Sequence, residues 1–119
     1  MFLEQLPSAY RYAFEFPDAT WFGAPIYELL EKAGVAFCVY EMAGSLSPVE
    51  VTADFVYVRL HGPSEGYQGG YSDQSLWQWA DRLKGWSESG HDVYAYFNND
   101  AEGHAPRDAA RLEAMLADA

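Results

Sequence analysis

Three shortages in this sequence, of cysteine, of basic residues and of long apolar runs, each exclude a class of protein. The one cysteine, Cys38, permits no intramolecular disulfide and fits a reducing compartment. Seven lysines and arginines face 18 aspartates and glutamates, and the formal net charge of −11 opposes non-specific binding to nucleic acid or anionic lipid. No apolar run approaches the roughly 18 residues of a membrane span, and no secretory signal peptide opens the chain. We expect a cytoplasmic protein without membrane association.

The sequence does contain enough apolar material for a core. Half of the 119 residues are hydrophobic, and nine Tyr, seven Phe and four Trp supply aromatic surface for a core or a binding cleft. No linker, repeat or low-complexity segment divides the chain. We predict one domain over residues 1–119 with no internal boundary. Cys38 lies within the apolar run 35–40, where a buried, unreactive thiol is expected.

Strands and helices are expected to alternate along the chain. Residue alternation and short apolar runs predict four strands, at 10–16, 35–40, 55–62 and 93–99. Helical spacing and end signals predict helices at 25–33, 72–87 and 104–117. This order predicts an α/β fold whose parallel strands are joined by right-handed crossovers.

Three further segments complete the expected organisation. Residues 2–6 are expected to end a helix that Pro7 stops, and residues 42–53 to form a loop. The last helix is expected to bury a stripe of four side chains, namely Ala105, Ala109, Leu112 and Leu116.

The strand at 55–62 has one face suited to a core and one that carries chemistry. Its side chains alternate strictly, with Val56, Val58 and Leu60 opposite Tyr57, Arg59 and His61. Gly62 then begins a loop rich in glycine and tyrosine that leads into the helix at 72–87. A basic pair at the carboxyl end of a strand is where α/β proteins place their sites.

The polar ends of the other strands are expected to meet this pair. Each expected strand carries a charged or amide residue at its carboxyl end, giving the set Glu15, Glu41, Arg59, His61 and Asn98. On three strands these residues share the less apolar face. A barrel interior, which opens at its top onto a site, accounts for them better than an open sheet with helices on both faces.

The residue types in this set indicate their roles. Arg59 is suited to hold a phosphate or carboxylate, His61 titrates near neutrality, and Glu15 or Glu41 would act as a base or fix the histidine tautomer. We therefore name His61, Glu15 and Glu41 as candidate catalytic residues. The candidate substrate-binding residues are Arg59, Tyr57, the amides Asn98 and Asn99, and Gly69 and Gly70, whose backbone N–H groups would approach an anion closely.

Several segments together resemble the YecE-like family (domain of unknown function 72). They are Glu15-Phe16 with Trp21, Tyr57-Val-Arg-Leu-His-Gly62, Tyr67 to Tyr71-Ser72 with Leu76 and Trp79-Ala80, and Phe97-Asn98-Asn99 with Gly103-His-Ala105. The resemblance implies the C-terminal half of a TIM-type (β/α)8 barrel, roughly strands five to eight. Since four strands cannot close a barrel, it also implies self-association or a missing N-terminal half barrel.

The chain departs from the family pattern at one corner. Where the family usually has Glu-Phe-Arg-His-Pro-Ser-Trp, this chain has Glu15-Phe-Pro-Asp-Ala-Thr-Trp21, so Pro17 and Asp18 replace two basic residues. The change weakens the case for anion binding beside Glu15. Glu41 stands where the family more often has Asp.

Two classes of function remain open at this stage. One is an enzyme-like half barrel acting on a small anionic ligand, phosphorylated or nucleotide-like, with Arg59 as anion clamp and His61 as acid or base. The other is a non-catalytic assembly module, or a truncated fragment that needs a partner half barrel. Arg59 paired with Glu15 or Glu41 would then be a structural ion pair. No His/Cys spacing supports a metal site at His61, so we assign no metal, and the sequence indicates no cofactor.

Overall fold

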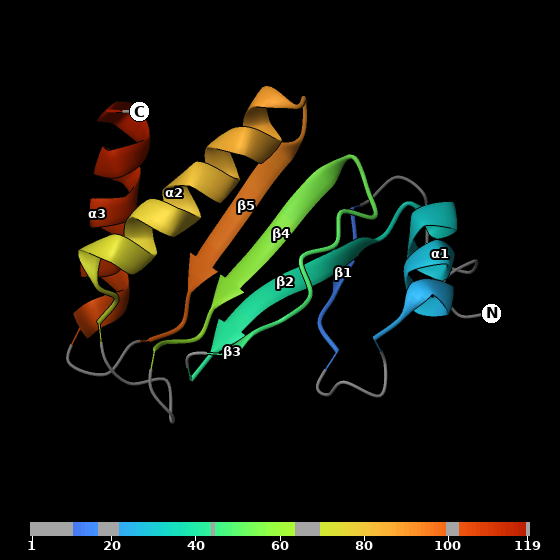
Figure 1. Ribbon diagram of the computed structural model, residues 1–119, viewed down its shortest axis with the longest axis horizontal. Helices are drawn as coiled ribbons and strands as arrows, with labels where there is room; N and C mark the ends of the chain where they lie inside the picture. The colour runs from blue at the N-terminus through green and yellow to red at the C-terminus, as the bar shows by residue number, and fades with distance from the viewer. Residues whose placement is uncertain (1–10, 17–21, 44, 64–69, 100–102, 119) are drawn as a thin grey trace.

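A mostly parallel sheet organises the chain. The computed structural model describes residues 11–16, 22–43, 45–63, 70–99 and 103–118 (Figure 1), so the helix expected at 2–6 lies outside the described residues. The sheet contains β1 (Ala13–Phe14), β2 (Ala36–Met42), β4 (Phe55–Leu60) and β5 (Asp92–Phe97) in the order β1-β2-β4-β5. All neighbouring pairs in this order are parallel, which confirms the predicted α/β fold.

The segment expected to be a loop contains one more short strand. β3 (Ser45–Leu46) pairs antiparallel with the end of β2. The hydroxyl of Ser47 accepts a hydrogen bond of 2.8 Å from the backbone N–H of Tyr40 and so fastens the returning segment to β2. Farther along, the buried Thr52 hydroxyl accepts from Phe37 N at 2.8 Å and donates to Val35 O at 2.7 Å. The connection to β4 is therefore tied to β2 by side-chain hydroxyls.

The three helices begin and end near their sequence signals. α1 (Ala24–Ala33) has Pro25 in its first turn and ends at Gly34, whose φ of 70° is the left-handed conformation that glycine adopts without strain. α2 (Asp73–Glu88) begins after Ser72, whose side chain accepts from Ser75 N at 3.1 Å. α3 (His104–Asp118) completes the described chain.

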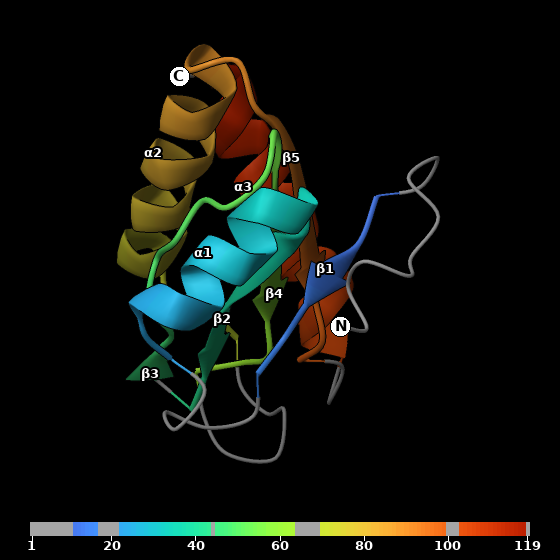
Figure 2. The same cartoon turned by 90° about the vertical axis from the view of Figure 1, so that its right-hand side faces the viewer.

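All three helices contribute side chains to a core on one face of the sheet. In Figure 2, α1 and α2 lie on the same side of the sheet. Val58 and Leu60 of β4 are fully buried there. They pack in one cluster with residues of each helix, among them Leu30, Trp79 and Leu112. Burial of this apolar face holds the helices against the sheet.

The opposite face of the sheet, which we call the open face, carries the polar and tyrosine side chains. Register places Tyr40 beside Arg59 and Arg59 beside Tyr96, so these three share one face. Tyr94 and Tyr96 remain 39% and 50% exposed, and the groove beside them is lined by residues of the strands or next to them, with no residue of a described helix.

One long side chain indicates that the open face is concave. Arg11, just before β1, donates from Nη1 to Asp92 Oδ2 at 2.9 Å and to the Tyr94 hydroxyl at 3.0 Å. β1 and β5 are opposite edges of the four-strand order and would lie about 14 Å apart in a flat sheet. A single arginine reaches from one edge strand to the other because the sheet curves towards it.

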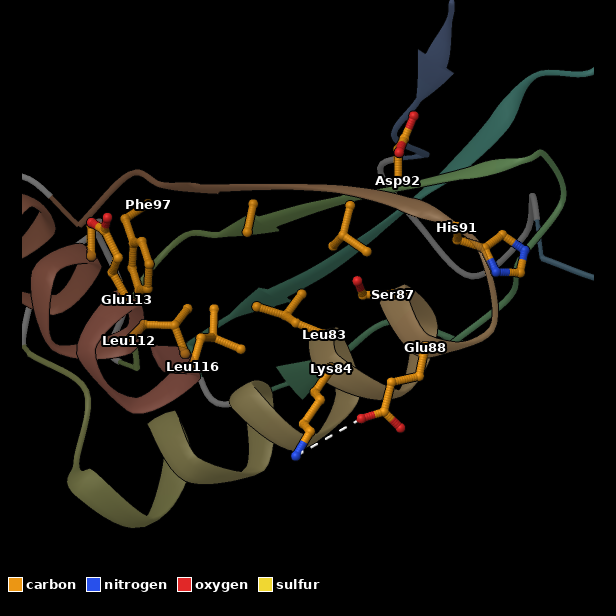
Figure 3. Close-up of a pocket in the computed structure, with 13 residues that line it drawn as sticks. Leu83, Lys84, Ser87, Glu88, His91, Asp92, Phe97, Leu112, Glu113 and Leu116 are labelled. Carbon is orange, nitrogen blue, oxygen red and sulfur yellow. Dashed lines mark ion pairs between the residues drawn. The ribbon is translucent and has the colours of Figure 1, made fainter. Parts of the chain in front are cut away.

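The buried stripe of α3 differs from the expected one. Ala105 and Leu112 are buried as predicted, but the third buried position belongs to Asp108. Ala109 and Leu116 are exposed and line a groove of about 610 Å³ between α2, α3 and β5 (Figure 3). The expectation for these two side chains was wrong because they face this groove, where no described element packs closely against them.

Candidate functional site

The carboxylate of Glu15 is the centre of a polar cluster on the open face. Its Oε1 atom lies 3.1 Å from His61 Nε2, 3.5 Å from Arg59 Nη1 and 3.6 Å from Cys38 Sγ. Glu15 follows β1, Cys38 belongs to β2, and the two basic groups come from β4 and its end. The parallel arrangement brings these carboxyl-end residues together, as the sequence indicated.

Arg59 joins this cluster to the end of β5. Its Nε and Nη2 atoms both donate to Asn98 Oδ1 at 3.2 Å, while Nη1 faces Glu15. The side chain is still 36% exposed. The guanidinium is thus fixed in orientation by two neighbours and keeps access to solvent, which suits a group that recognises an anion.

His61 is held more tightly, with only 2% of its side chain exposed. Its backbone N–H donates to Glu41 O at 2.8 Å and continues the β2–β4 pairing past the end of the strand. Its ring lies edge-on to Tyr40, with centroids 6.1 Å apart, and the Tyr40 hydroxyl donates to Phe16 O at 3.1 Å. The imidazole Nε2 atom therefore lies at hydrogen-bond distance from Glu15, and the Glu15 carboxylate is the less buried side of the pair.

The thiol of Cys38 is not a nucleophile in this setting. Burial raises its pKa to about 12, and the negative charge of Glu15 raises it further in the same direction. The protonated thiol instead donates a weak hydrogen bond to Glu15 Oε1. Cys38 acts as a small buried donor in the cluster, in line with the unreactive thiol expected from its apolar surroundings.

Glu41 lies on the other face of the sheet. It is in register with Leu60, whose side chain is fully buried on the helix-covered face. There its carboxylate is close to the hydroxyl of Tyr71. Burial raises the pKa of Tyr71, and the charge of Glu41 adds to that rise. The structure therefore does not bring Glu41 to the Glu15 carboxylate, and Glu15 alone provides the acid partner of His61 that the sequence assigned to either residue.

Asn99 points into a buried network rather than towards Arg59. It is fully buried, and its Nδ2 atom donates to Asp108 Oδ2 at 2.8 Å. Asp108 also accepts from Tyr71 N at 2.9 Å and from Arg111 Nη1 at 3.0 Å. Sequence reasoning missed Asp108, Tyr71 and Arg111. The available signal was an aspartate placed three residues after Ala105 on the expected buried stripe of the last helix.

Gly69 and Gly70 were named as candidate residues for anion binding through their backbone N–H groups. Gly69 lies outside the described residues. At Gly70 an added Cβ would lie 2.9 Å from His104 Nδ1, so the missing side chain makes room for the imidazole at the start of α3. The predicted approach of an anion to this loop stays a prediction.

Tyr57 lines a groove of about 440 Å³ on the open face. Its ring lies 5.3 Å from that of Tyr96 at an interplanar angle of 32°, and burial raises its pKa. Glu15 and Arg59 lie at the same groove, whose complete lining is Arg11, Ala13, Glu15, Cys38, Phe55, Tyr57, Arg59, Tyr94 and Tyr96. Its size is within the range of small-molecule sites.

The described residues contain no group of three or more His, Cys, Asp or Glu side chains placed to hold a metal ion. None of the helices in this part of the chain combines the length and apolarity needed to cross a membrane.

Comparisons with known proteins give a family and a fold. Residues 1–119 match the model of a family described as protein of unknown function DUF72. A DUF72 family protein from Thermotoga maritima is similar, with a TM-score of 0.84 and 29% identity, and the match covers 98% of this chain and 49% of that chain. No curated protein matches the chain.

Two crystal structures of a DUF72 family protein from Enterococcus faecalis also share the fold. Both have a TM-score of 0.76, with 15% and 16% identity, and each match covers 92% of this chain. They are covered over 48% and 50% of their own length. The chain thus spans about half the length of the solved relatives.

Proposed function

We propose that this chain, which belongs to the DUF72 family of unknown function, binds a small anionic ligand, phosphorylated or nucleotide-like, at the carboxyl ends of β4 and β5. Arg59 is the anion clamp, and the His61–Glu15 pair is the acid–base group. This assignment keeps Glu15 and leaves Glu41 as a contact of Tyr71.

The position of the Arg59 guanidinium is the observation that carries this proposal. Asn98 and Glu15 fix its plane from two sides, and a third of the side chain still faces solvent at the groove. A structural ion pair does not require access to a ligand, whereas the Arg59 guanidinium lines the groove on the open face. A preoriented, accessible guanidinium loses little entropy when it binds a phosphate with two parallel hydrogen bonds.

The acid–base role follows from the arrangement of Glu15. Its carboxylate touches the buried imidazole of His61 and is itself accessible, so a proton can pass between ligand and histidine through one oxygen. Asn98 accepts from Arg59 through Oδ1, which leaves its Nδ2 group to donate to charge developing on a ligand. Tyr57 supplies an aromatic wall of the groove.

Calorimetric titration with inorganic phosphate, pyrophosphate and adenosine monophosphate tests the proposal. We expect at least one probe to bind and Arg59→Gln to weaken it about tenfold or more, since a charge-assisted bidentate contact is lost. The matched control is Lys84→Gln, which removes an exposed cation paired with Glu88 on α2 and should leave the affinity unchanged. Absence of binding by all three probes, or equal affinity in the Arg59 variant, would refute the anion site.

A second candidate function, assembly with a complementary half barrel, rests on the open face. Parallel sheets are ordinarily covered on both faces, yet Tyr94 and Tyr96 are exposed here and β5 ends the strand order. The solved relatives are about twice as long as this chain. We propose that residues 1–119 form one domain, the C-terminal half of a TIM-type barrel, and that a non-identical βα half pairs with its edges. A second copy is disfavoured because it would bring together two chains of −11 each.

Sedimentation of the chain mixed with the unmatched half of the Thermotoga maritima protein tests the assembly. A one-to-one complex that Tyr96→Glu abolishes, and that Trp77→Glu on the exposed surface of α2 preserves, is the expected result. Formation of a two-fold dimer by the chain alone would make a second copy the partner instead. If the chain stays monomeric and does not bind the added half, the proposed assembly function is contradicted.

A further inference from the structure

Asp108 is a buried carboxylate that lies away from the Glu15 cluster. Only 2% of the residue is exposed, a costly position for a charge unless hydrogen bonds compensate it. Oδ2 accepts from Tyr71 N at 2.9 Å and from Asn99 Nδ2 at 2.8 Å, and Oδ1 accepts from Arg111 Nη1 at 3.0 Å. One side chain of α3 thus ties together the segment before α2, the end of β5 and its own helix.

Both of the Oδ2 contacts continue to the candidate site. The hydroxyl of Tyr71 accepts from the backbone N–H of Gly62 at 3.0 Å, and Gly62 follows His61 directly. Gly62 has a φ of 118°, so its own backbone preference does little to fix the chain there, and the bond to Tyr71 provides that restraint. Asp108 is therefore linked to His61 through Tyr71 and Gly62.

The second contact leads to the arginine. Asn99 is anchored by Asp108, and its neighbour Asn98 accepts both the Nε and Nη2 bonds of Arg59 at 3.2 Å. Fixing the Asn99 side chain fixes the backbone from which Asn98 projects. Arg59 of β4 and His61, which follows β4, are thus both linked by hydrogen bonds to the Asp108 carboxylate, which lies outside the sheet.

We infer that Asp108 is a positioning residue for the site, holding Arg59 through Asn99 and Asn98 and holding His61 through Tyr71 and Gly62. The inference rests on the proposed anion-binding function for its consequence, but the orientation itself is measurable without a ligand. Asp108 touches none of the groups that would contact the anion, so its effect is indirect, through backbone and hydrogen-bond geometry.

Two substitutions separate positioning from folding. Asp108→Ala removes all three accepted bonds. Asp108→Asn retains one oxygen that can accept from both Tyr71 N and Asn99 Nδ2, while its amide group faces the Arg111 donor. The matched control is Glu113→Gln, which neutralises an exposed carboxylate on the same helix. Circular dichroism shows which variants are folded. If Asp108→Ala does not fold, the measurement is made on Asp108→Asn.

The measurement is NMR of the Arg59 Nε–H signal and of the His61 ring, followed by phosphate titration. In the wild type and in Glu113→Gln we expect a resolved, slowly exchanging Arg59 Nε–H signal and one set of His61 ring signals. In Asp108→Ala we expect loss of the Arg59 signal, a change in the chemical shifts of the His61 ring and phosphate affinity lowered about tenfold, with intermediate values in Asp108→Asn.

The outcomes distinguish this inference from the proposed function. If the wild type fails to bind phosphate but Asp108→Ala still loses the Arg59 signal, the positioning holds and the anion site fails. If a folded Asp108→Ala or Asp108→Asn variant keeps the wild-type Arg59 and His61 signals, the inference is overturned, and Asp108 serves only to stabilise α3.

Discussion

The Glu15 carboxylate and the His61 imidazole meet at 3.1 Å although 46 residues separate them in the sequence. The contact exists because β1, β2 and β4 are adjacent parallel strands, so that their carboxyl ends lie along one edge. Arg59 and Cys38 approach the same oxygen. One partly buried carboxylate therefore contacts two basic side chains and accepts a weak hydrogen bond from the Cys38 thiol.

Neutralising Glu15 should destabilise the fold. Glu15→Gln keeps the shape of the side chain but leaves Arg59 without its ion pair and replaces an acceptor beside buried His61. We expect the free energy of unfolding in urea to fall by about 1–3 kcal/mol. The exposed Glu28→Gln on α1 is the control and should change it by less than about 0.5 kcal/mol. Equal stability of the two variants would mean that the cluster contributes nothing to the fold.

Cys38 should make stability depend on pH in the alkaline range. Its folded-state pKa is raised from 9.0 to about 12, so above pH 9 the unfolded chain releases the thiol proton while the folded chain retains it. The stabilisation is fully present below pH 9 and decreases as pH rises towards 12. Urea unfolding at pH 8 and pH 10 should show a larger decrease for the wild type than for Cys38→Ser. Identical decreases would show that the thiol pKa is not raised.

Gly70 should tolerate no side chain. In Gly70→Ala the new Cβ would lie 2.9 Å from His104 Nδ1, and we expect a loss of stability of about 1–3 kcal/mol from overpacking. Gly85→Ala is the matched control, because it lies in α2 with open space around its Cβ and should gain up to about 1 kcal/mol. Thermal unfolding measures both changes.

A double-mutant cycle identifies the cause of the Gly70 effect. Adding His104→Ala to Gly70→Ala should recover most of the lost stability, since the two side chains would then no longer collide. Additive losses in the double variant would place the strain elsewhere.

Thr52 should be essential for joining the β3–β4 connection to β2. Its buried hydroxyl accepts from Phe37 N and donates to Val35 O, so Thr52→Val would leave a buried backbone donor and acceptor unpaired. We expect a loss of about 1–3 kcal/mol in chemical denaturation. Val51→Thr, an exposed neighbour, is the control. A neutral Thr52→Val would imply that water replaces the hydroxyl.

Local patterns were sufficient for the three helices and the four parallel strands, but not for β3, which lies in a segment expected to be a loop. The αL glycine at Gly34, the N-cap at Ser72 and the two-residue alternation of β4 each depend on neighbours in sequence, and the structure confirms them. The α/β order with parallel strands followed from the same signals. Two apolar positions of α3, Ala109 and Leu116, could not be assigned in this way, because whether a helix stripe is covered depends on what packs against it.

The sequence by itself determined the alternation of strands and helices and placed Glu15, Arg59, His61 and Asn98 at carboxyl ends, since these depend on periodicity and short-range signals. Only the tertiary structure decided that Glu15 and not Glu41 pairs with His61, because strand register and pleat choose the face of each side chain. It likewise decided that Asp108 anchors Asn99 and Tyr71. These contacts join residues distant in sequence, and their geometry exists only once the helices pack on the sheet.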